Sequence, residues 1–343
     1  MFYFNNDYNE LAHERILKAL HDHNYTQTPG YGKDPFCEKA KELLRSYFHC
    51  PNSDIYFFMA GTITNLTMID HMLRPYEAII ATKKAHIHLH EAGSVEMTGH
   101  KILLAEDENG KILPESIERL VRLHSADDHM VLPRAVYVSN ATELGTVYTK
   151  KELEAIHDVC AKHKLFLFLD GARLGAALAS PYSDLKPEDL SAFCDAFYVG
   201  GTKNGALLGE ALILLHSDLK KNFFRNMKGR GAVYAKGKVL GLEYLELFKD
   251  DLYMELATHA DRLAMKVEKD LKDLFHFAAR VESNQIFLYL TEKECQNLQQ
   301  KFGFEVQEET DPSQICIRLV TSWATPPQAV DELIHVLRSM RTS

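Results

Sequence analysis

Short apolar runs alternate with amphipathic segments through the middle of the chain. The apolar runs predict strands at Ile55–Met59, Ala78–Ala81, Ile102–Ala105, Ala135–Val138, Leu165–Leu169, Phe197–Val199 and Ala211–Leu215. Between them, apolar residues at helical spacing predict helices, most clearly at Thr62–Leu73 and Lys151–His163. Strands separated by helices of this length are typical of a mainly parallel sheet, so we expect an α/β fold.

The two ends of the chain have a different pattern. The last part contains a long helical pattern at Asp250–Leu274, strand-like runs at Gln285–Leu290 and Ile315–Val320, and a terminal helix at Pro327–Met340. The first part has one predicted helix, Ala12–His23, and no strand set of its own. We therefore expect an N-terminal segment at 1–40 that packs on a domain or a neighbouring subunit, a large domain at 41–249, and a small α+β domain at 250–343.

Charge and composition narrow the function. The 343 residues carry a net charge of −9 with no Lys/Arg cluster, which argues against a nucleic-acid partner. No apolar run approaches the ~18–20 residues that span a bilayer, and the polar start of the chain does not resemble a signal peptide. Six separated cysteines without a CxxC pair fit reduced thiols, so we expect a cytoplasmic protein.

Polar residues follow five of the predicted strands. In open α/β sheets, ligands bind beyond the carboxyl ends of the strands. The residues that follow these ends are Gly61 and Thr62, His86, Asn140, Asp170, and Lys203. Their collection at one edge of the sheet indicates a binding site more strongly than any single motif does.

Lys203 and Asp170 each allow several interpretations. Lys203 follows a Gly-Gly-Thr turn, but Asn204 stands where a Walker A phosphate loop needs Ser or Thr. The lysine is then a Schiff-base lysine, whose amine must lose its proton, or an ordinary surface lysine. Asp170 ends a strongly apolar strand, where a carboxylate needs a partner. That partner is a protonated pyridine nitrogen, the Arg173 guanidinium, or a helix N-terminus that the carboxylate caps.

Three further features have both a functional and a structural interpretation. Gly61 and Thr62 open a helix and offer N–H groups to a phosphate, or Thr62 is a plain N-cap. The alternating histidines of residues 86–90 would share one face of a strand, as metal ligands do. Alternatively, His86 stacks on an aromatic cofactor and the other two form hydrogen bonds at the sheet edge. Arg318 interrupts an apolar strand, which indicates a bound carboxylate or a salt bridge.

Taken together, these segments resemble the fold-type-I enzymes that use pyridoxal 5'-phosphate (PLP), with an aspartate aminotransferase-like large domain. Within that group they resemble the low-specificity L-threonine aldolases of the β-eliminating lyase superfamily. The segments that carry the resemblance are FNNDYNELAHERIL, TPGYGKDP, MAGTITNL, AHIHLHEAGSVEMTGHK, SNATELGTVYTKKEL, LFLDGARLGAAL, YVGGTKNGALLGEALI, RGAVYAKGKVLG and IRLVTSWAT. Two elements are specific: DGAR with a lysine about thirty residues later, and HEAG followed by TGHK.

The resemblance implies PLP as cofactor and three groups of site residues. The residues that act on the cofactor ring are Lys203, which links to it covalently, Asp170, which pairs with the pyridine nitrogen, and His86, which stacks on it. The residues that bind the phosphate are Gly61, Thr62, Thr202 and, across a subunit interface, Lys236. The residues at the substrate are Asn6, Arg173 and Arg318, which bind its carboxylate, and Tyr31, which comes from a neighbouring subunit.

The implied reaction is retro-aldol cleavage of a β-hydroxy-α-amino acid, such as L-threonine or L-allo-threonine, to glycine and an aldehyde. Many members of the family have serine at the position of Asn6 and histidine at that of Thr142. We therefore expect His86, or a water near it, to take the β-hydroxyl proton. The alternatives are a β-eliminating lyase and a weakly catalytic PLP-binding protein. The resemblance also implies a homodimer or homotetramer with shared active sites.

Overall fold

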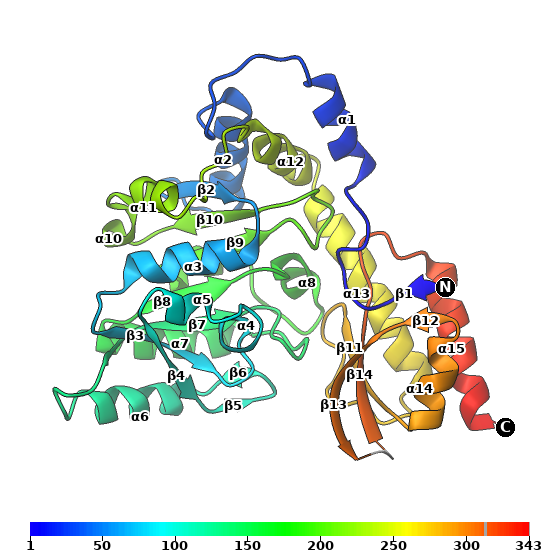
Figure 1. Ribbon diagram of the computed structural model, residues 1–343. Helices are drawn as coiled ribbons and strands as arrows, with labels where there is room; N and C mark the ends of the chain where they lie inside the picture. Colours follow the sequence, from blue (N-terminus) through cyan, green and yellow to red (C-terminus); the bar gives the residue numbers. More distant parts are fainter. Residues whose placement is uncertain (312–313, 343) are drawn as a thin grey trace.

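The computed structural model describes residues 1–311 and 314–342. Its largest element is a seven-stranded sheet with the order β2-β10-β9-β8-β7-β3-β4 (Figure 1). The strands are β2 (Asp54–Phe58), β3 (Glu77–Thr82), β4 (Lys101–Ala105), β7 (Leu132–Ser139), β8 (Phe166–Asp170), β9 (Ala196–Gly200) and β10 (Glu210–Leu214). Only β10 runs opposite to the other six strands, so the expected mainly parallel α/β sheet is confirmed.

Helices cover both faces of this sheet. One face carries α2 (Pro35–Tyr47), α6 (Pro114–His124), α7 (Lys150–His163), α9 (Pro187–Phe193) and α12 (Lys238–Phe248). The other face carries α3 (Gly61–Met72), α4 (His86–Leu89), α5 (Ser94–Met97), α10 (Ser217–Lys220) and α11 (Phe223–Gly229). Each central strand is therefore buried on both faces, which explains why it is a continuous apolar run in the sequence.

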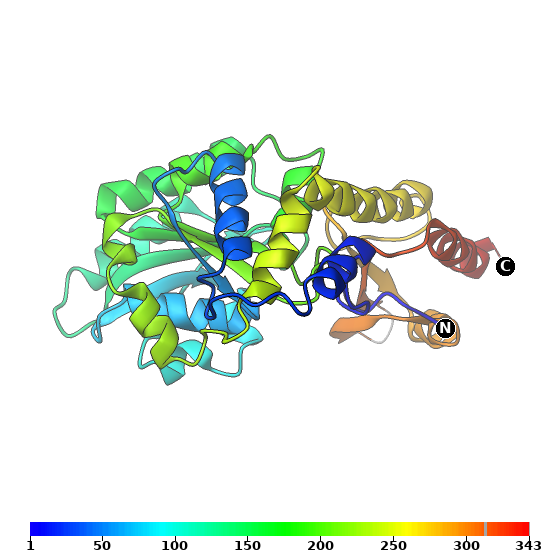
Figure 2. The same cartoon turned by 90° about the horizontal axis from the view of Figure 1, so that it is seen from above.

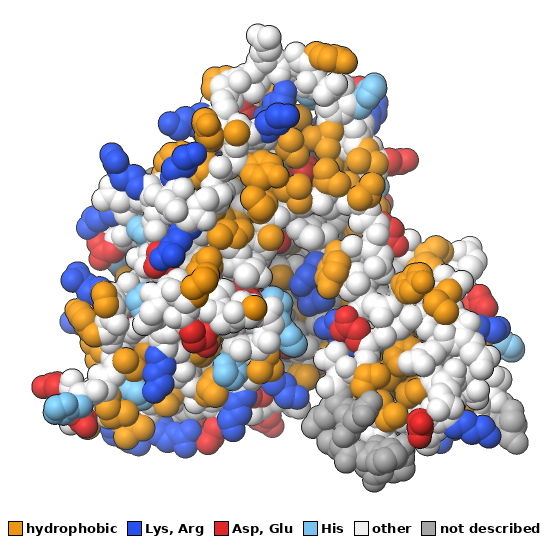
Figure 3. Space-filling model, in the orientation of Figure 1, with side chains coloured by type: hydrophobic (Ala, Val, Ile, Leu, Met, Phe, Trp, Pro, Cys, Tyr) orange, Lys and Arg blue, Asp and Glu red, His pale blue; other side chains and the backbone are white. Residues whose placement is uncertain are grey.

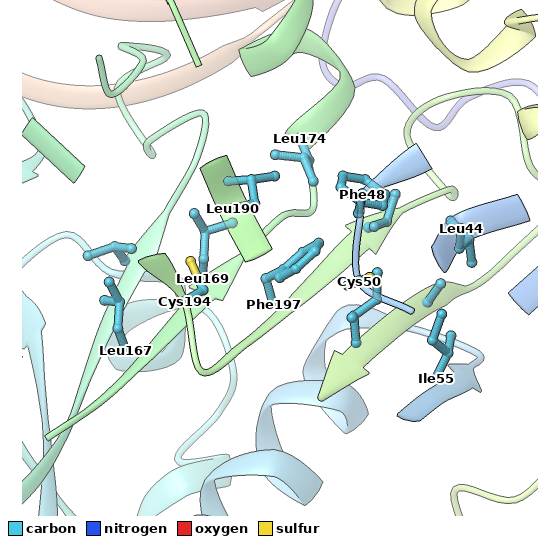
Figure 4. Close-up of a cluster of buried hydrophobic side chains, with 14 of the residues drawn as sticks. Leu44, Phe48, Cys50, Ile55, Leu167, Leu169, Leu174, Leu190, Cys194 and Phe197 are labelled. Carbon is cyan, nitrogen blue, oxygen red and sulfur yellow. The ribbon is translucent and has the colours of Figure 1, made fainter. Parts of the chain in front are cut away.

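Consecutive side chains of a central strand point to opposite faces of the sheet and pack in different hydrophobic cores. In β8, Leu167 and Leu169 belong to the core under α2 and α7, whereas Phe168 belongs to the core under α3. Figure 4 shows the first of these cores, where the Phe48 ring lies 5.1 Å from the Phe197 ring, centre to centre. This double burial fixes the strand ends, and with them the residues that follow each strand.

Side chains cap several helices at their first residues. The Asp34 carboxylate accepts the N–H groups of Phe36 and Cys37 at the start of α2. Thr149 and Glu152 form a capping box at the start of α7. Helix α3 differs, because no side chain of the described residues caps it. Its first N–H groups therefore stay available where β2 ends.

A second, smaller sheet and its helices contain most of the C-terminal part of the chain (Figures 1 and 2). We call this part the C-terminal region. Its antiparallel sheet has the order β11-β14-β13, with β11 (Gln285–Leu290), β13 (Glu305–Asp311) and β14 (Gln314–Val320). Its helices are α14 (Glu292–Gln299), α15 (Pro327–Thr342) and the second half of α13 (Leu252–Leu271). The first half of α13 packs on the core of the large sheet, so this helix connects the large sheet with the C-terminal region.

The N-terminal segment contacts both the C-terminal region and the helices of the large sheet. Strand β1 (Phe2–Tyr3) pairs with β12 (Phe302–Gly303), and Phe4 lies in the C-terminal core. Helix α1 (Glu14–Asp22) packs beside α12.

The remaining short elements lie on the large sheet. Helix α8 (Leu174–Ala179) packs on α13, and β5 (Asp107–Glu108) and β6 (Lys111–Ile112) form a short hairpin. No helix within the described residues is long and apolar enough to cross a bilayer. Figure 3 shows a cleft between the C-terminal region and the rest of the molecule, with charged and histidine side chains on its walls.

Candidate active site

The carboxyl ends of the parallel strands border a cavity of about 380 Å³. Seven of the eleven site residues expected from the sequence line it: Gly61, Thr62, His86, Asp170, Arg173, Thr202 and Lys203. Asp170 is the last residue of β8, and the others follow β2, β3, β8 and β9, whose ends meet at one edge of the sheet. The other four, Asn6, Tyr31, Lys236 and Arg318, lie elsewhere.

Lys203 lies three residues beyond the end of β9. Burial lowers the pKa of its amine, and the positive charge of Arg173 lowers it further. An amine that loses its proton readily can attack a carbonyl carbon.

The chain after β8 passes very close to the end of β9. A Cβ on Gly171 would lie 1.8 Å from the carbonyl oxygen of Tyr198, so only glycine fits there. This glycine allows the ends of the two strands, and the site residues that they position, to come together.

The Asp170 carboxylate is buried and accepts four hydrogen bonds. The hydroxyl of Tyr198 and the N–H of Ala172 donate to Oδ1, at 2.5 and 3.0 Å. The hydroxyl of Tyr137 and the amide of Asn65 donate to Oδ2, at 2.5 and 3.0 Å. These bonds fix the carboxylate at the cavity wall. A salt bridge from Asp170 to Arg173 and a capping role, both considered from the sequence, are not what the described residues show.

The His86 ring is oriented by a buried carboxylate. Its Nδ1 lies 2.8 Å from Oε1 of Glu91, whose side chain is fully buried. The amide of Asn65 donates to the same oxygen at 2.8 Å and also to Asp170. One hydrogen-bonded network therefore connects His86 with Asp170 across the back of the cavity.

The strand geometry considered for the three histidines is wrong. Residues 86–89 form the single helical turn α4, closed by a hydrogen bond from the N–H of His90 to the carbonyl of His86. His86 and His90 lie one turn apart, with ring centres separated by 5.6 Å. The described residues contain no group of three metal-binding side chains.

The residues of this cavity fit PLP. The uncapped N-terminus of α3 offers N–H groups to a phosphate. A Cβ on Gly61 would lie 3.1 Å from the Tyr198 hydroxyl, so glycine at this position avoids crowding the tyrosine that bonds Asp170. A lysine amine, a fixed carboxylate for a cationic ring nitrogen and an oriented imidazole complete the set of groups that such a cofactor needs.

Arg173 already holds a carboxylate of this chain. Its Nε and Nη2 donate to the two oxygens of Asp7, at 2.7 and 3.1 Å. Asp7 is completely buried and also accepts the amide of Asn284 at 2.8 Å. Burial alone would raise the pKa of Asp7, but the positive charges of Arg173 and Lys203 outweigh it and lower that pKa. Asp7 is not among the site residues expected from the sequence.

Arg318 forms an ion pair outside the cavity lining. Its Nη2 lies 2.5 Å from a carboxylate oxygen of Glu305 and 3.4 Å from the carbonyl of Asn5. Burial lowers the pKa of Arg318, and the nearby charge of Arg173 adds to this. The side chain of Asn6 accepts the N–H of Tyr8, which does line the cavity.

Tyr31 and Lys236 lie away from this cavity. Tyr31 borders a separate cavity of about 290 Å³, where the Lys228 ammonium lies 4.7 Å from the centre of its ring. Lys236 borders a third cavity of about 860 Å³, formed with residues 23–30.

Two carboxylates of the cavity were missed from the sequence. Glu143 follows β7 and lines the cavity beside His86. Glu210 opens β10, and burial raises its pKa to about 8. One oxygen of Glu210 has no hydrogen-bond partner among the described residues. Glu143 lies within SNATELG, one of the segments that carry the family resemblance, and its position after a predicted strand was the available signal.

The chain is similar to known proteins along most of its length. A family model described as "Beta-eliminating lyase" matches residues 18–293. A protein of Pseudomonas aeruginosa named low specificity L-threonine aldolase is 32% identical, over 93% of this chain and 92% of that protein. A solved structure of Leishmania major threonine aldolase is 40% identical and superposes with a TM-score of 0.97, covering 99% of both chains. A single mutant of Thermus thermophilus aspartate aminotransferase, 15% identical with a TM-score of 0.71 over 96% of this chain and 89% of its own, confirms the expected fold.

Proposed function

The chain belongs to the β-eliminating lyase family, and on that premise we propose that it is a PLP-dependent aldolase acting on β-hydroxy-α-amino acids. It would cleave L-threonine or L-allo-threonine to glycine and acetaldehyde. The observation that carries the proposal is that Lys203 and Asp170 line one cavity together with Arg173. The names of the Pseudomonas and Leishmania proteins support this substrate class.

Different residues of the cavity would bind different parts of the cofactor. Lys203 would attach it through its amine, and Asp170 would face its ring nitrogen from the opposite end. His86, held by Glu91, would lie against the ring. The first N–H groups of α3 and the Thr202 hydroxyl would hold the phosphate. When bound, PLP supplies an electron-accepting ring next to the substrate Cα.

Arg173 is suited to orient the substrate. Asp7 occupies its Nε and Nη2, and within the described part of the chain Nη1 forms no hydrogen bond. This nitrogen is therefore available to the carboxylate of the amino acid. Arg318 would add a second contact after exchanging Glu305 for that carboxylate. A fixed carboxylate places the β-hydroxyl of the substrate within reach of a base on the cavity wall.

We further propose that the protein acts as a homodimer or homotetramer with shared sites. Tyr31 and Lys236 lie on other surfaces of the single chain, so the family roles of these two residues require a second subunit. The exposed Tyr25 side chain, which borders the same cavity as Lys236, would be covered in such an assembly.

One assay tests the proposed function. The purified holoenzyme is incubated with L-threonine and with L-allo-threonine, and glycine, acetaldehyde, ammonia and 2-oxo acids are measured. We expect glycine and acetaldehyde in equal amounts, and no product from Lys203→Ala. Ammonia with a 2-oxo acid in place of glycine would assign the chain to β-elimination instead. A cofactor-loaded protein without any product would make it a binding protein.

A further inference from the structure

The aldolase reaction needs a base for the β-hydroxyl proton, and Thr142 does not supply it. Thr142 is buried, with its hydroxyl 2.7 Å from that of Thr146 and accepting the N–H of Leu144 at 3.3 Å. A threonine hydroxyl is also far too weak a base near neutral pH. The next residue, Glu143, lines the cavity.

Glu143 has one anchored oxygen and one available oxygen. Oε1 accepts the Ser139 hydroxyl at 2.6 Å and the backbone N–H of His86 at 3.0 Å. Oε2 accepts no hydrogen bond from any other residue that the structure describes. The two anchors hold the carboxylate beside the His86 segment, which is itself at the cavity. Burial raises the pKa of Glu143, which makes its anion a stronger base than an exposed carboxylate.

The other ionisable groups of the cavity are less suited to this step. The Asp170 carboxylate already accepts four hydrogen bonds. Glu210 opens the antiparallel strand and interacts with Lys203, so it belongs to the lysine side of the cavity. His86 directs its Nδ1 at the Glu91 carboxylate, which leaves only the Nε2 lone pair for a proton. That lone pair lies in the plane of the ring, so with the ring against the cofactor it would be directed along the cofactor face and not toward a group that stands above it.

We propose that Glu143 is the catalytic base that removes the β-hydroxyl proton of the substrate, an inference that rests on the proposed aldolase function. The proton moves from the β-hydroxyl to Oε2, and the O–H electron pair becomes the second bond of the aldehyde C=O. The Cα–Cβ bond breaks with its electron pair left on Cα, which is then protonated to give glycine. Glu143 thus takes over the step that His86 was expected to perform.

The test compares two reactions of the same holoenzyme. Cleavage of L-threonine needs the hydroxyl base, whereas exchange of the glycine α-proton for solvent deuterium does not. Glu143→Gln keeps an oxygen for both anchoring donors and removes only the basic group. We expect its kcat for threonine cleavage to fall by roughly 10²–10⁴-fold, the usual effect of losing a general base, and glycine exchange to continue at nearly the wild-type rate.

Three further variants complete the test. Glu154→Gln, an exposed glutamate on α7, should leave both reactions unchanged. Ser139→Ala removes one anchor, so cleavage should fall much less than in Glu143→Gln if basicity and not anchoring is what matters. Glu143→Ala leaves space for a small carboxylate, and added formate should restore part of its threonine cleavage.

Four results would overturn the proposal. The first is wild-type cleavage by Glu143→Gln, and the second is an equal loss of cleavage and glycine exchange, which would make Glu143 structural. The third is failure of both Glu143 variants to fold, which would likewise assign the residue to stability. The fourth is wild-type enzyme that exchanges glycine but releases none from threonine. That result refutes the aldolase function itself and is recognised before any variant is made.

Discussion

Asp7→Asn is expected to lower the stability of the folded protein. Asp7 is completely buried and bonds both donor atoms of one edge of Arg173. The asparagine would keep the shape but leave the guanidinium without its counter-charge. Removing one partner of a buried ion pair costs about 3–5 kcal/mol. Because Arg173 borders the cavity and retains some contact with water, we expect about 3 kcal/mol, at the lower end of that range.

A double-mutant cycle measures this interaction. Asp7→Asn, Arg173→Met and the double variant are unfolded in urea without cofactor and followed by circular dichroism. The double variant should lose about 2–3 kcal/mol less than the sum of the single variants, because it leaves no unpaired charge. Asp22→Asn, in an exposed pair with Lys18, is the matched control and should keep the wild-type midpoint. A wild-type midpoint for Asp7→Asn, or additive effects, would refute the reasoning.

The same pair predicts a pH dependence. The pKa of Asp7 in the folded protein lies below its ordinary value of 3.8. Such a group stabilises the folded state above its unfolded pKa, and this stabilisation is lost as the pH falls through the lowered folded value. Asp7→Asn should therefore lose less stability than the wild type when the pH is lowered below about 4. Equal acid sensitivity of the two proteins would show that Asp7 is not responsible.

Three other predictions concern the cofactor, the substrate and the assembly. Lys203→Ala should lose the visible absorbance of bound PLP and its fixation by borohydride. Arg318→Ala should lower kcat/KM for threonine roughly 30- to 1000-fold, about 2–4 kcal/mol, with an unchanged cofactor spectrum; a variant that does not fold would instead assign Arg318 to its pair with Glu305. Mixing Lys203→Ala chains with Tyr31→Phe chains should restore part of the activity, whereas a fully active monomer in sedimentation would contradict shared sites.

The central sheet could be predicted because its strands are buried on both faces. The predicted run Leu165–Leu169 corresponds to β8, Phe166–Asp170, displaced by a single residue. The direction of β10 could not be predicted, since an apolar run has the same pattern in either orientation. Helix α2 was missed because its buried positions, Cys37, Ala40 and Leu44, form a thin stripe among charged residues.

The histidine segment shows how a short pattern misleads. Three alternating residues fit a strand, but His86 and His90 are four apart and therefore also share one face of a helical turn. The segment is too short for periodicity to decide between the two. The neighbouring contacts decide: the His86 N–H bonds Glu143 and its ring bonds Glu91, and both bonds hold the turn at the cavity.

The site could be predicted only where a residue follows a parallel strand. That rule finds Asp170 and Lys203, because parallel strands present their carboxyl ends to the same edge. It misses Glu210, because β10 runs the other way and presents its first residue to that edge. It also misses Asp7, which reaches Arg173 from 166 residues away through an N-terminal segment with no predicted strand. Neither the antiparallel strand that carries Glu210 nor the N-terminal segment that carries Asp7 has a sequence pattern that indicates a site. Only the folded structure shows that both carboxylates lie close to Lys203.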